Sequence, residues 1–321
     1  MTPDSVPPET GSLLALGRWL QARGYHFTTV TPATHARIAA RTGTEPACDL
    51  RDIFGCSRAF AHGLLDPQPL QWLREAGLLG HTPDGLLRSK VRFSSLSECL
   101  FAHSAYPTSE ADAVFFGPDT VRFAALIEAE LARLPLSAGT RILDVGCGAG
   151  PGGIVAARLA QASRPELLLA DINPRALRFA RANALLAGVA RSAFAQGDLF
   201  SAVSGAFDLI VANPPYLNDS AKRTYRHGGG DWGGGLSERI VHEGLPCLRP
   251  GGRLLLYTGT AIVQGDDPLL HALQPHLDRR DWPWSYRELD PDVFGEELDQ
   301  PAYAGAERIA ALALVVQRPA L

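Results

Sequence analysis

The middle of the chain alternates short apolar runs with longer stretches of helical periodicity. Each run is continuous rather than alternating, which is typical of a strand buried on both faces of a parallel sheet. The stretches between them repeat apolar residues at helical spacing, so this region predicts successive strand–helix–strand units. The predicted strands are the run that begins at Arg141, Leu167–Ala170, Ala193–Ala195 and Phe207–Ala212, and the predicted helices begin near Gly152 and cover Pro174–Leu186.

The same alternation continues toward the C-terminus. Pro250-Gly251-Gly252 follows a helical pattern and marks its end. The predicted helices here are Leu236–Leu248 and one near Pro268–Leu277, and the predicted strands are Arg253–Tyr257, Trp284–Leu289 and Ile309–Val316. Strands and helices in this order predict an α/β domain, which we place at residues 113–321.

Residues 10–112 carry a different pattern, in which several helical stretches precede a hairpin signal. Asp84-Gly85 between apolar runs is that signal. The predicted helices cover the stretch around Leu13–Leu20, Thr34–Arg41, a segment starting at Asp49, and Pro67–Ala76. Helices followed by a hairpin are typical of a winged-helix module, which in different proteins reads DNA, joins two subunits or caps a substrate.

The borders of this smaller N-terminal domain follow from local patterns. Residues 1–9 predict a disordered tail. Arg88, Lys90 and Arg92 alternate along the predicted wing, and we expect them to form a solvated strand face. The α/β domain begins near Phe115, with Asp119 or Thr120 capping a helix that runs to about Leu134.

Composition narrows the class of protein. A chain of 321 residues with 46% hydrophobic residues can form two packed domains. The net charge of −4 gives no general attraction to nucleic acid. Five cysteines without a C-x-x-C pair fit a reducing, cytoplasmic location. We expect no membrane association, because no apolar stretch approaches the ~20 residues of a membrane span.

Polar side chains follow four of the predicted strands, namely Asp144, Asp171, Asp198 and Asn213. In an open parallel sheet ligands bind outside the carboxyl ends of the strands, so we expect these four side chains around one site. A carboxylate at Asp171 can accept hydrogen bonds from both hydroxyls of a ribose. Asp198 can accept from an adenine amino group, and Ile172 can pack on the purine face.

The first of these strand ends is rich in glycine. Gly146, Gly148 and Gly150 follow Asp144 with the spacing G-x-G-x-G, which differs from the dinucleotide-binding spacing G-x-G-x-x-G. Glycines allow a tight turn and a close approach of the backbone to a ligand. An acid before the turn suits a cationic amino-acid ligand better than a pyrophosphate.

The fourth strand ends in Asn213-Pro214-Pro215-Tyr216. The Asn side-chain oxygen and the next backbone carbonyl can both accept from one planar NH2 group, and the prolines remove competing N–H donors. The Tyr ring offers a flat face for stacking. Holding both hydrogens of a conjugated nitrogen favours its reactive, pyramidal geometry. The motif therefore indicates alkylation of an amide or aromatic amine.

Together these motifs resemble the class I S-adenosylmethionine-dependent methyltransferases, over residues 115–318. The resemblance implies a Rossmann-like seven-stranded sheet with a C-terminal antiparallel hairpin, and S-adenosylmethionine as the cofactor. It assigns catalysis to Asn213, Pro214 and Tyr216. It assigns cofactor binding to Asp144, Gly146, Gly148, Gly150, Asp171, Ile172, Asp198, Leu199 and Asn213.

The acceptor of the methyl group is a separate question. The Asn-Pro-Pro-Tyr form is similar to the HemK/PrmC glutamine methyltransferases, which modify peptide-release factors, and also occurs in adenine-N6 and guanine-N2 nucleic-acid methylases. We favour a protein glutamine. A nucleic acid, a small molecule and a non-catalytic cofactor-binding regulator stay open. The N-terminal domain would contact the acceptor or join two copies into a homodimer.

Other residues near the motif are candidates for contact with the acceptor. Pro215, Tyr216 and His227 are three of them, and His227 could accept a proton after transfer. Six glycines between Gly228 and Gly235 predict a mobile lid. We expect its Trp232 to pack over the bound acceptor or cofactor. No His/Cys cluster with metal-ligand spacing occurs, so we expect no metal.

Overall fold

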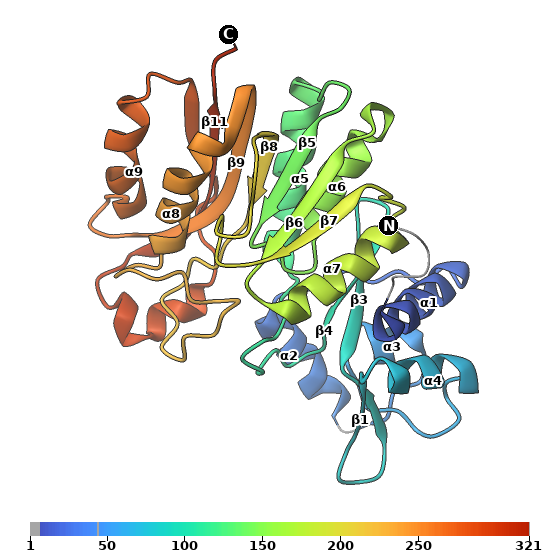
Figure 1. Ribbon diagram of the computed structural model, residues 1–321. Coiled ribbons are helices and arrows are strands. Elements are labelled where there is room, and N and C mark those ends of the chain that lie inside the picture. Colours follow the sequence, from blue (N-terminus) through green and yellow to red (C-terminus); the bar gives the residue numbers. More distant parts are fainter. Residues whose placement is uncertain (1–6, 44, 321) are drawn as a thin grey trace.

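A seven-stranded sheet forms the centre of the protein in the computed structural model, which describes residues 7–43 and 45–320 (Figure 1). Its strand order is β10-β11-β9-β8-β5-β6-β7. Neighbours from β7 to β9 are parallel, whereas β11 runs antiparallel to β9 and β10. The strands are β5 (Arg141–Val145), β6 (Glu166–Asp171), β7 (Ser192–Gln196), β8 (Phe207–Ala212), β9 (Leu248–Ile262), β10 (Trp284–Asp290) and β11 (Arg308–Gln317). The predicted Rossmann-like sheet with a C-terminal hairpin is confirmed.

Helices cover both faces of this sheet (Figure 1). On one face lie α5 (Pro118–Arg133), α6 (Pro151–Leu159) and α7 (Pro174–Leu186), and on the other lie α8 (Gly235–Gly244) and α9 (Pro268–Asp278). The apolar side chains of the two faces form two separate core clusters. Since each parallel strand is buried on both sides, its sequence is a continuous apolar run. Short 3-10 helices are η2 (Gln161–Ser163), η3 (Leu245–Cys247), η4 (Gly295–Asp299) and η5 (Pro301–Tyr303).

The described residues of the N-terminal region form four helices and two antiparallel hairpins. The helices are α1 (Pro8–Ala22), α2 (Pro32–Thr42), α3 (Leu50–Phe54) and α4 (Pro67–Glu75), and the hairpins pair β1 (Leu79–His81) with β2 (Leu87–Ser89) and β3 (Val91–Leu96) with β4 (Cys99–Ser104). The tail predicted over residues 1–9 is wrong at Pro8 and Glu9, which already belong to α1. Residues 1–6 lie outside the described residues.

The predicted wing needs a second correction. Its apolar-and-basic run is split at Lys90 between two different hairpins, β1–β2 and β3–β4. Arg88 and Lys90 are exposed as expected. Arg92 points the other way and is only 4% exposed. The reason is that β3 packs into the interior of the molecule, so both of its faces are largely buried.

The N-terminal region shares a core with the sheet domain. Buried side chains of α1, α3 and β4 pack with Ala176, Phe179 and Ala182 of α7 in one cluster. The buried Asn183 amide donates to the carbonyls of Ala102 and Ala149 and accepts from the Ala102 N–H. The division at residue 112 therefore stays a prediction. Within the described ranges, no helix is both long and apolar enough to cross a membrane.

Candidate active site

A cavity of about 370 Å³ opens at the carboxyl ends of β5, β6 and β8. Most of the predicted site residues line it, because parallel strands bring their ends to one edge of the sheet. These residues are Asp144, Gly146, Gly148, Asp171, Ile172, Asp198, Leu199, Asn213, Pro214, Pro215, Tyr216 and His227. Gly150 and Trp232 do not line it. The predicted convergence of the four strand ends is thus present in the structure.

The glycine turn after β5 forms one wall of the cavity. Gly146 and Gly148 have φ values of 65° and 54°, a left-handed backbone that glycine adopts without strain. A Cβ at Gly146 would meet no atom within 4 Å. Gly150 serves the turn instead of the cavity. It precedes α6 at φ 83°, and a Cβ there would lie 3.1 Å from Ile154 Cδ1, so tight helix packing explains this glycine.

Two carboxylates stand behind this turn. Asp171 accepts from the N–H groups of Gly148 and Asn173, each at 2.8 Å and each on a different oxygen. Asp144 is buried, and its Oδ2 accepts from the Gly153 N–H at 2.7 Å. Burial raises the pKa of Asp144 to about 7; the Gly153 N–H lowers it, and the charge of Asp171 adds to the rise. Asp144 is therefore poised between its neutral and ionised forms near neutral pH.

Asp198 has a different environment from the other strand-end acids. Its exposed carboxylate forms an ion pair with Arg239 of α8, with N···O distances of 3.0 and 3.2 Å. This pair was not apparent from the sequence, since the two residues are 41 positions apart. Asp198 still lines the cavity, beside Leu199.

The motif after β8 is held by a buried hydrogen-bond network. The Tyr216 hydroxyl donates to Asp119 Oδ2 at 2.7 Å, and the Tyr257 hydroxyl donates to Asp119 Oδ1 at 2.9 Å. Burial raises the pKa of Asp119, whereas the two hydroxyls and Arg122 lower it. The sequence motif indicated a role only for the ring of Tyr216. The hydroxyl is in fact tied to the first turn of α5.

Asp119 was expected at this helix start, but as a cap. The N-cap of α5 is Gly117, and it is Thr120 Oγ1 that accepts from the Gly117 N–H. This frees Asp119 to turn inward, where it lines the cavity. Its role as the acceptor for Tyr216 and Tyr257 is visible only in the structure, because these residues are 97 and 138 positions away in the chain.

The glycine-rich segment 228–235 packs against the motif. A Cβ at Gly228 would overlap the Gly233 carbonyl, and one at Gly233 would overlap the carbonyl of Tyr216. Glycine is needed here because backbones touch directly. Trp232 does not cover the cavity as predicted. Its ring packs against Tyr303, with ring centroids 6.4 Å apart.

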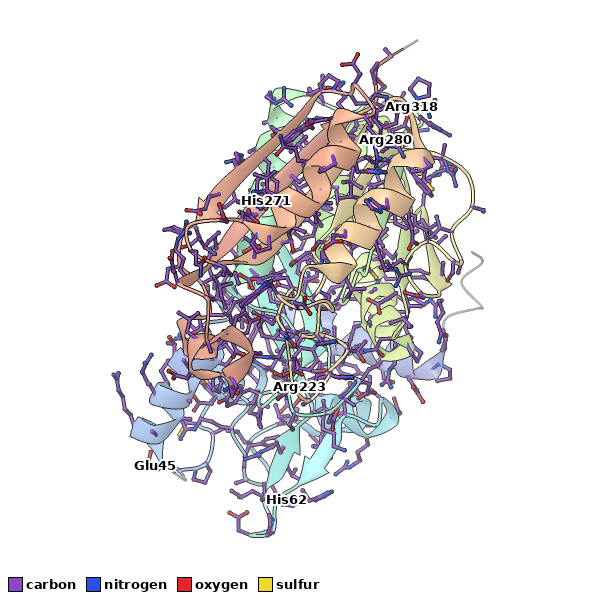
Figure 2. The ribbon with its side chains drawn as sticks, turned by 90° about the vertical axis from the view of Figure 1, so that its left-hand side faces the viewer. Glu45, His62, Arg223, His271, Arg280 and Arg318 are labelled. Carbon is purple, nitrogen blue, oxygen red and sulfur yellow. The ribbon has the colours of Figure 1, made fainter. Side chains whose placement is uncertain are left out.

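The mouth of the cavity contains residues that the sequence motifs did not indicate. Phe115 and Tyr225 both line it, with their rings stacked at 6.3 Å and 13°. Figure 2 shows Arg223, which neighbours Tyr225 in sequence, on a loop between the sheet domain and the N-terminal hairpins. Arg223 pairs with the buried Asp219, and Arg226 pairs with Glu297. These ion pairs anchor the loop that carries His227.

Comparison with known proteins identifies the family. The model of the methyltransferase small domain matches residues 124–264. A release factor glutamine methyltransferase of Cereibacter sphaeroides is 31% identical over 279 residues, which cover 76% of this chain and 92% of that protein. The chain belongs to the release factor glutamine methyltransferase (HemK/PrmC) family. Two further family members match over shorter regions. The Deinococcus radiodurans protein is 36% identical over 59% of this chain, and the Koribacter versatilis protein is 34% identical over 53%. The matches span only 66% and 60% of those two relatives.

Proposed function

We propose that this protein transfers the methyl group of S-adenosylmethionine to the side-chain amide nitrogen of a glutamine in a protein. The observation that supports it is the shared cavity: Asn213–Tyr216 line the same space as the glycine turn after β5 and the carboxylate of Asp171. The Asn213–Tyr216 motif, which can bind a planar nitrogen, thus faces a site suited to a nucleoside with a cationic amino acid. The names of the relatives favour a protein acceptor over a nucleic acid.

The residues around the cavity fit S-adenosylmethionine. Each oxygen of Asp171 accepts one backbone N–H and keeps a lone pair, so the carboxylate is held in place while it can still accept from ribose hydroxyls. Ile172 is 53% exposed beside it and can cover an adenine face. Gly146 leaves open space where a side chain would project. Asp144, when ionised, can pair with the cationic end of the ligand.

Bound S-adenosylmethionine supplies a methyl group on a positively charged sulfur, which a nitrogen lone pair can attack. Asn213 and the carbonyl of Pro214 would accept the two hydrogens of the acceptor amide and aim its lone pair. Among the described residues the Asn213 side chain has no hydrogen-bond partner, so its oxygen is available. The Tyr216 ring would support the amide in an orientation that Asp119 holds through the hydroxyl.

His227 would contact the acceptor from the opposite loop. Within the described part of the chain its Nδ1 atom is buried without a hydrogen-bond partner, which leaves Nε2 as the nitrogen able to meet a ligand. The amide nitrogen must lose one proton after transfer, and Nε2 could receive it. The N-terminal region would position the acceptor protein at the mouth.

The test is transfer of label from S-adenosylmethionine to a release factor, to a variant release factor with Asn in place of the acceptor Gln, and to total RNA. We expect label in the release factor alone, recovered as N5-methylglutamine after proteolysis. The Asn213→Ala variant should bind S-adenosylmethionine normally but transfer little label. Label that accumulates in RNA and not in the protein would overturn the proposal.

A further inference from the structure

Arg92 of β3 is a buried cation that forms no ion pair with any described residue. Its side chain is 4% exposed, and its Nε and Nη2 atoms have no hydrogen-bond partner among the described residues. The ring of Phe27 lies 5.4 Å from its Cζ atom. This ring contact does not supply the hydrogen-bond acceptors that the guanidinium N–H groups lack. A buried charge with unsatisfied donors is destabilising, so the fold keeps it at a cost.

A second arginine provides a comparison within the same molecule. Arg253 of β9 is 2% exposed, yet its Nη1 and Nη2 atoms donate to the carbonyls of Glu130 and Leu134 at 3.2 and 2.6 Å. Backbone carbonyls at the end of α5 thus accept hydrogen bonds from Arg253. The Nε and Nη2 groups of Arg92 have no such acceptor among the described residues. The difference indicates that the partner of Arg92 is supplied from outside the described chain.

Arg92 lines a small pocket next to the N-terminal hairpins. The pocket has a volume of about 10 Å³, and none of its lining residues is acidic. His35 and His103 lie in its wall, and burial, followed by the charge of Arg92, lowers the pKa of both. His103 is fixed by Ser94 on Nε2 and by the Ser104 carbonyl on Nδ1. Among the described residues that line the pocket, the guanidinium is therefore the only charged group.

This pocket adjoins the candidate active site. Phe115 lines both spaces. Tyr225 stacks on Phe115 at the mouth of the larger cavity, and its hydroxyl donates to the carbonyl of Thr108, which lines the smaller pocket. The two spaces are therefore neighbours that share Phe115 in their walls.

We propose that the Arg92 pocket is a binding site for a carboxylate group. The charge requires an anion, and the planar guanidinium matches the two oxygens of a carboxylate. The small volume of the pocket favours the smallest planar anion of this kind. Two sources carry this chemistry. One is an acidic side chain of the acceptor protein, which rests on the proposed function, and the other is a free small carboxylate.

Formate is the probe for the site, with thermal unfolding as the readout. At constant ionic strength, replacing a bulky sulfonate with formate should raise the Tm of the wild type, because a ligand that binds only the folded state stabilises it. The Arg92→Met variant should lose this response. The exposed Arg88→Met variant removes the same charge from the neighbouring strand β2 and should keep it. Equal responses in all three proteins would overturn the proposal.

A more conservative substitution tests the same proposal if Arg92→Met does not fold. Arg92→Lys keeps the charge but offers a single nitrogen, so its apparent Kd for formate should rise at least several-fold. An unchanged Kd would again contradict a carboxylate held by the guanidinium. These measurements need no turnover, so they stand even if methyl transfer to protein is not found.

Methyl-transfer kinetics then separate the two sources. If the acceptor protein supplies the carboxylate, formate should raise the KM for the acceptor and leave the affinity for S-adenosylmethionine unchanged, and Arg92→Met should raise the same KM. If the ligand is a free carboxylate, formate should leave that KM unchanged while still raising the Tm.

Discussion

Removing the Tyr216 hydroxyl tests the link between the buried network and catalysis. Tyr216→Phe deletes a 2.7 Å hydrogen bond to a buried carboxylate, a kind of bond worth about 1.5–3 kcal/mol. For a chain of 321 residues the entropy of unfolding is about 0.7 kcal/mol/K, so the Tm should fall by roughly 2–4 °C. The freed ring should also orient the acceptor less well. We expect kcat to fall by about tenfold, which corresponds to ~1.4 kcal/mol of transition-state stabilisation.

Tyr257→Phe is the matched control. Its hydroxyl donates to the same carboxylate at 2.9 Å, and its ring is also buried, but it does not line the cavity. The Tm should fall by a similar amount, measured by calorimetry, whereas kcat and the KM for the acceptor should stay close to wild type. Equal kinetic losses in Tyr216→Phe and Tyr257→Phe would show that the network acts only through stability. A Tyr216→Phe variant with wild-type Tm and turnover would refute the reasoning altogether.

Four further predictions concern the same site. Asp171→Ala should weaken S-adenosylmethionine binding by about 1–3 kcal/mol, because polar groups that hydrogen-bond to the carboxylate lose their acceptor. Equal affinities of wild type and variant by calorimetry would defeat the assignment. Asn213→Ala should lower kcat by roughly 10²-fold with little change in cofactor affinity, which single-turnover and binding assays separate. The pKa of Asp144 is about 7 in the folded protein and near 3.9 in the unfolded chain, so the folded state holds the proton more tightly. This difference contributes at most about 4 kcal/mol of stability, which is fully present below about pH 4 and is lost as the pH rises through 7. The Tm advantage of Asp144→Asn over wild type should therefore be larger at pH 8 than at pH 5, and parallel Tm profiles would contradict it. A Cβ at Gly259 would overlap the ring of Tyr216, so Gly259→Ala should cost about 1–3 kcal/mol of stability and lower kcat, whereas a variant with wild-type unfolding and turnover would argue against a fixed ring.

The elements of the sheet domain were predictable because each one is encoded locally. The apolar run Phe207–Ala212 is a strand with the predicted bounds, and Pro174–Leu186 is a helix with the predicted bounds. The strand predicted over Arg253–Tyr257 is longer, at Leu248–Ile262. Pairing with β11 continues to Ile262, and Leu248 pairs with Phe207 of β8. The helix predicted over Leu236–Leu248 ends at Gly244, and a 3-10 turn that contains Pro246 follows.

The convergence of the strand-end residues was also determined by the sequence. Parallel strands separated by helices place their carboxyl ends at one edge, so the order of Asp144, Asp171 and Asn213 along the chain was enough to predict a common cavity. Gly150 shows the limit of that reasoning. A motif places a glycine in a turn, but whether it faces a ligand or a packed helix depends on neighbours far along the chain.

Only the tertiary structure decided the directions and partners of single side chains. Trp232 packs against Tyr303 and does not line the cavity, a contact between residues 71 positions apart that the local sequence does not reveal. Arg92 is buried and lines a small pocket, although its alternation with Arg88 and Lys90 predicted a solvated face. Periodicity in a sequence reports the local backbone, whereas burial, charge pairing and hydrogen bonding arise between residues that the fold brings together from distant positions.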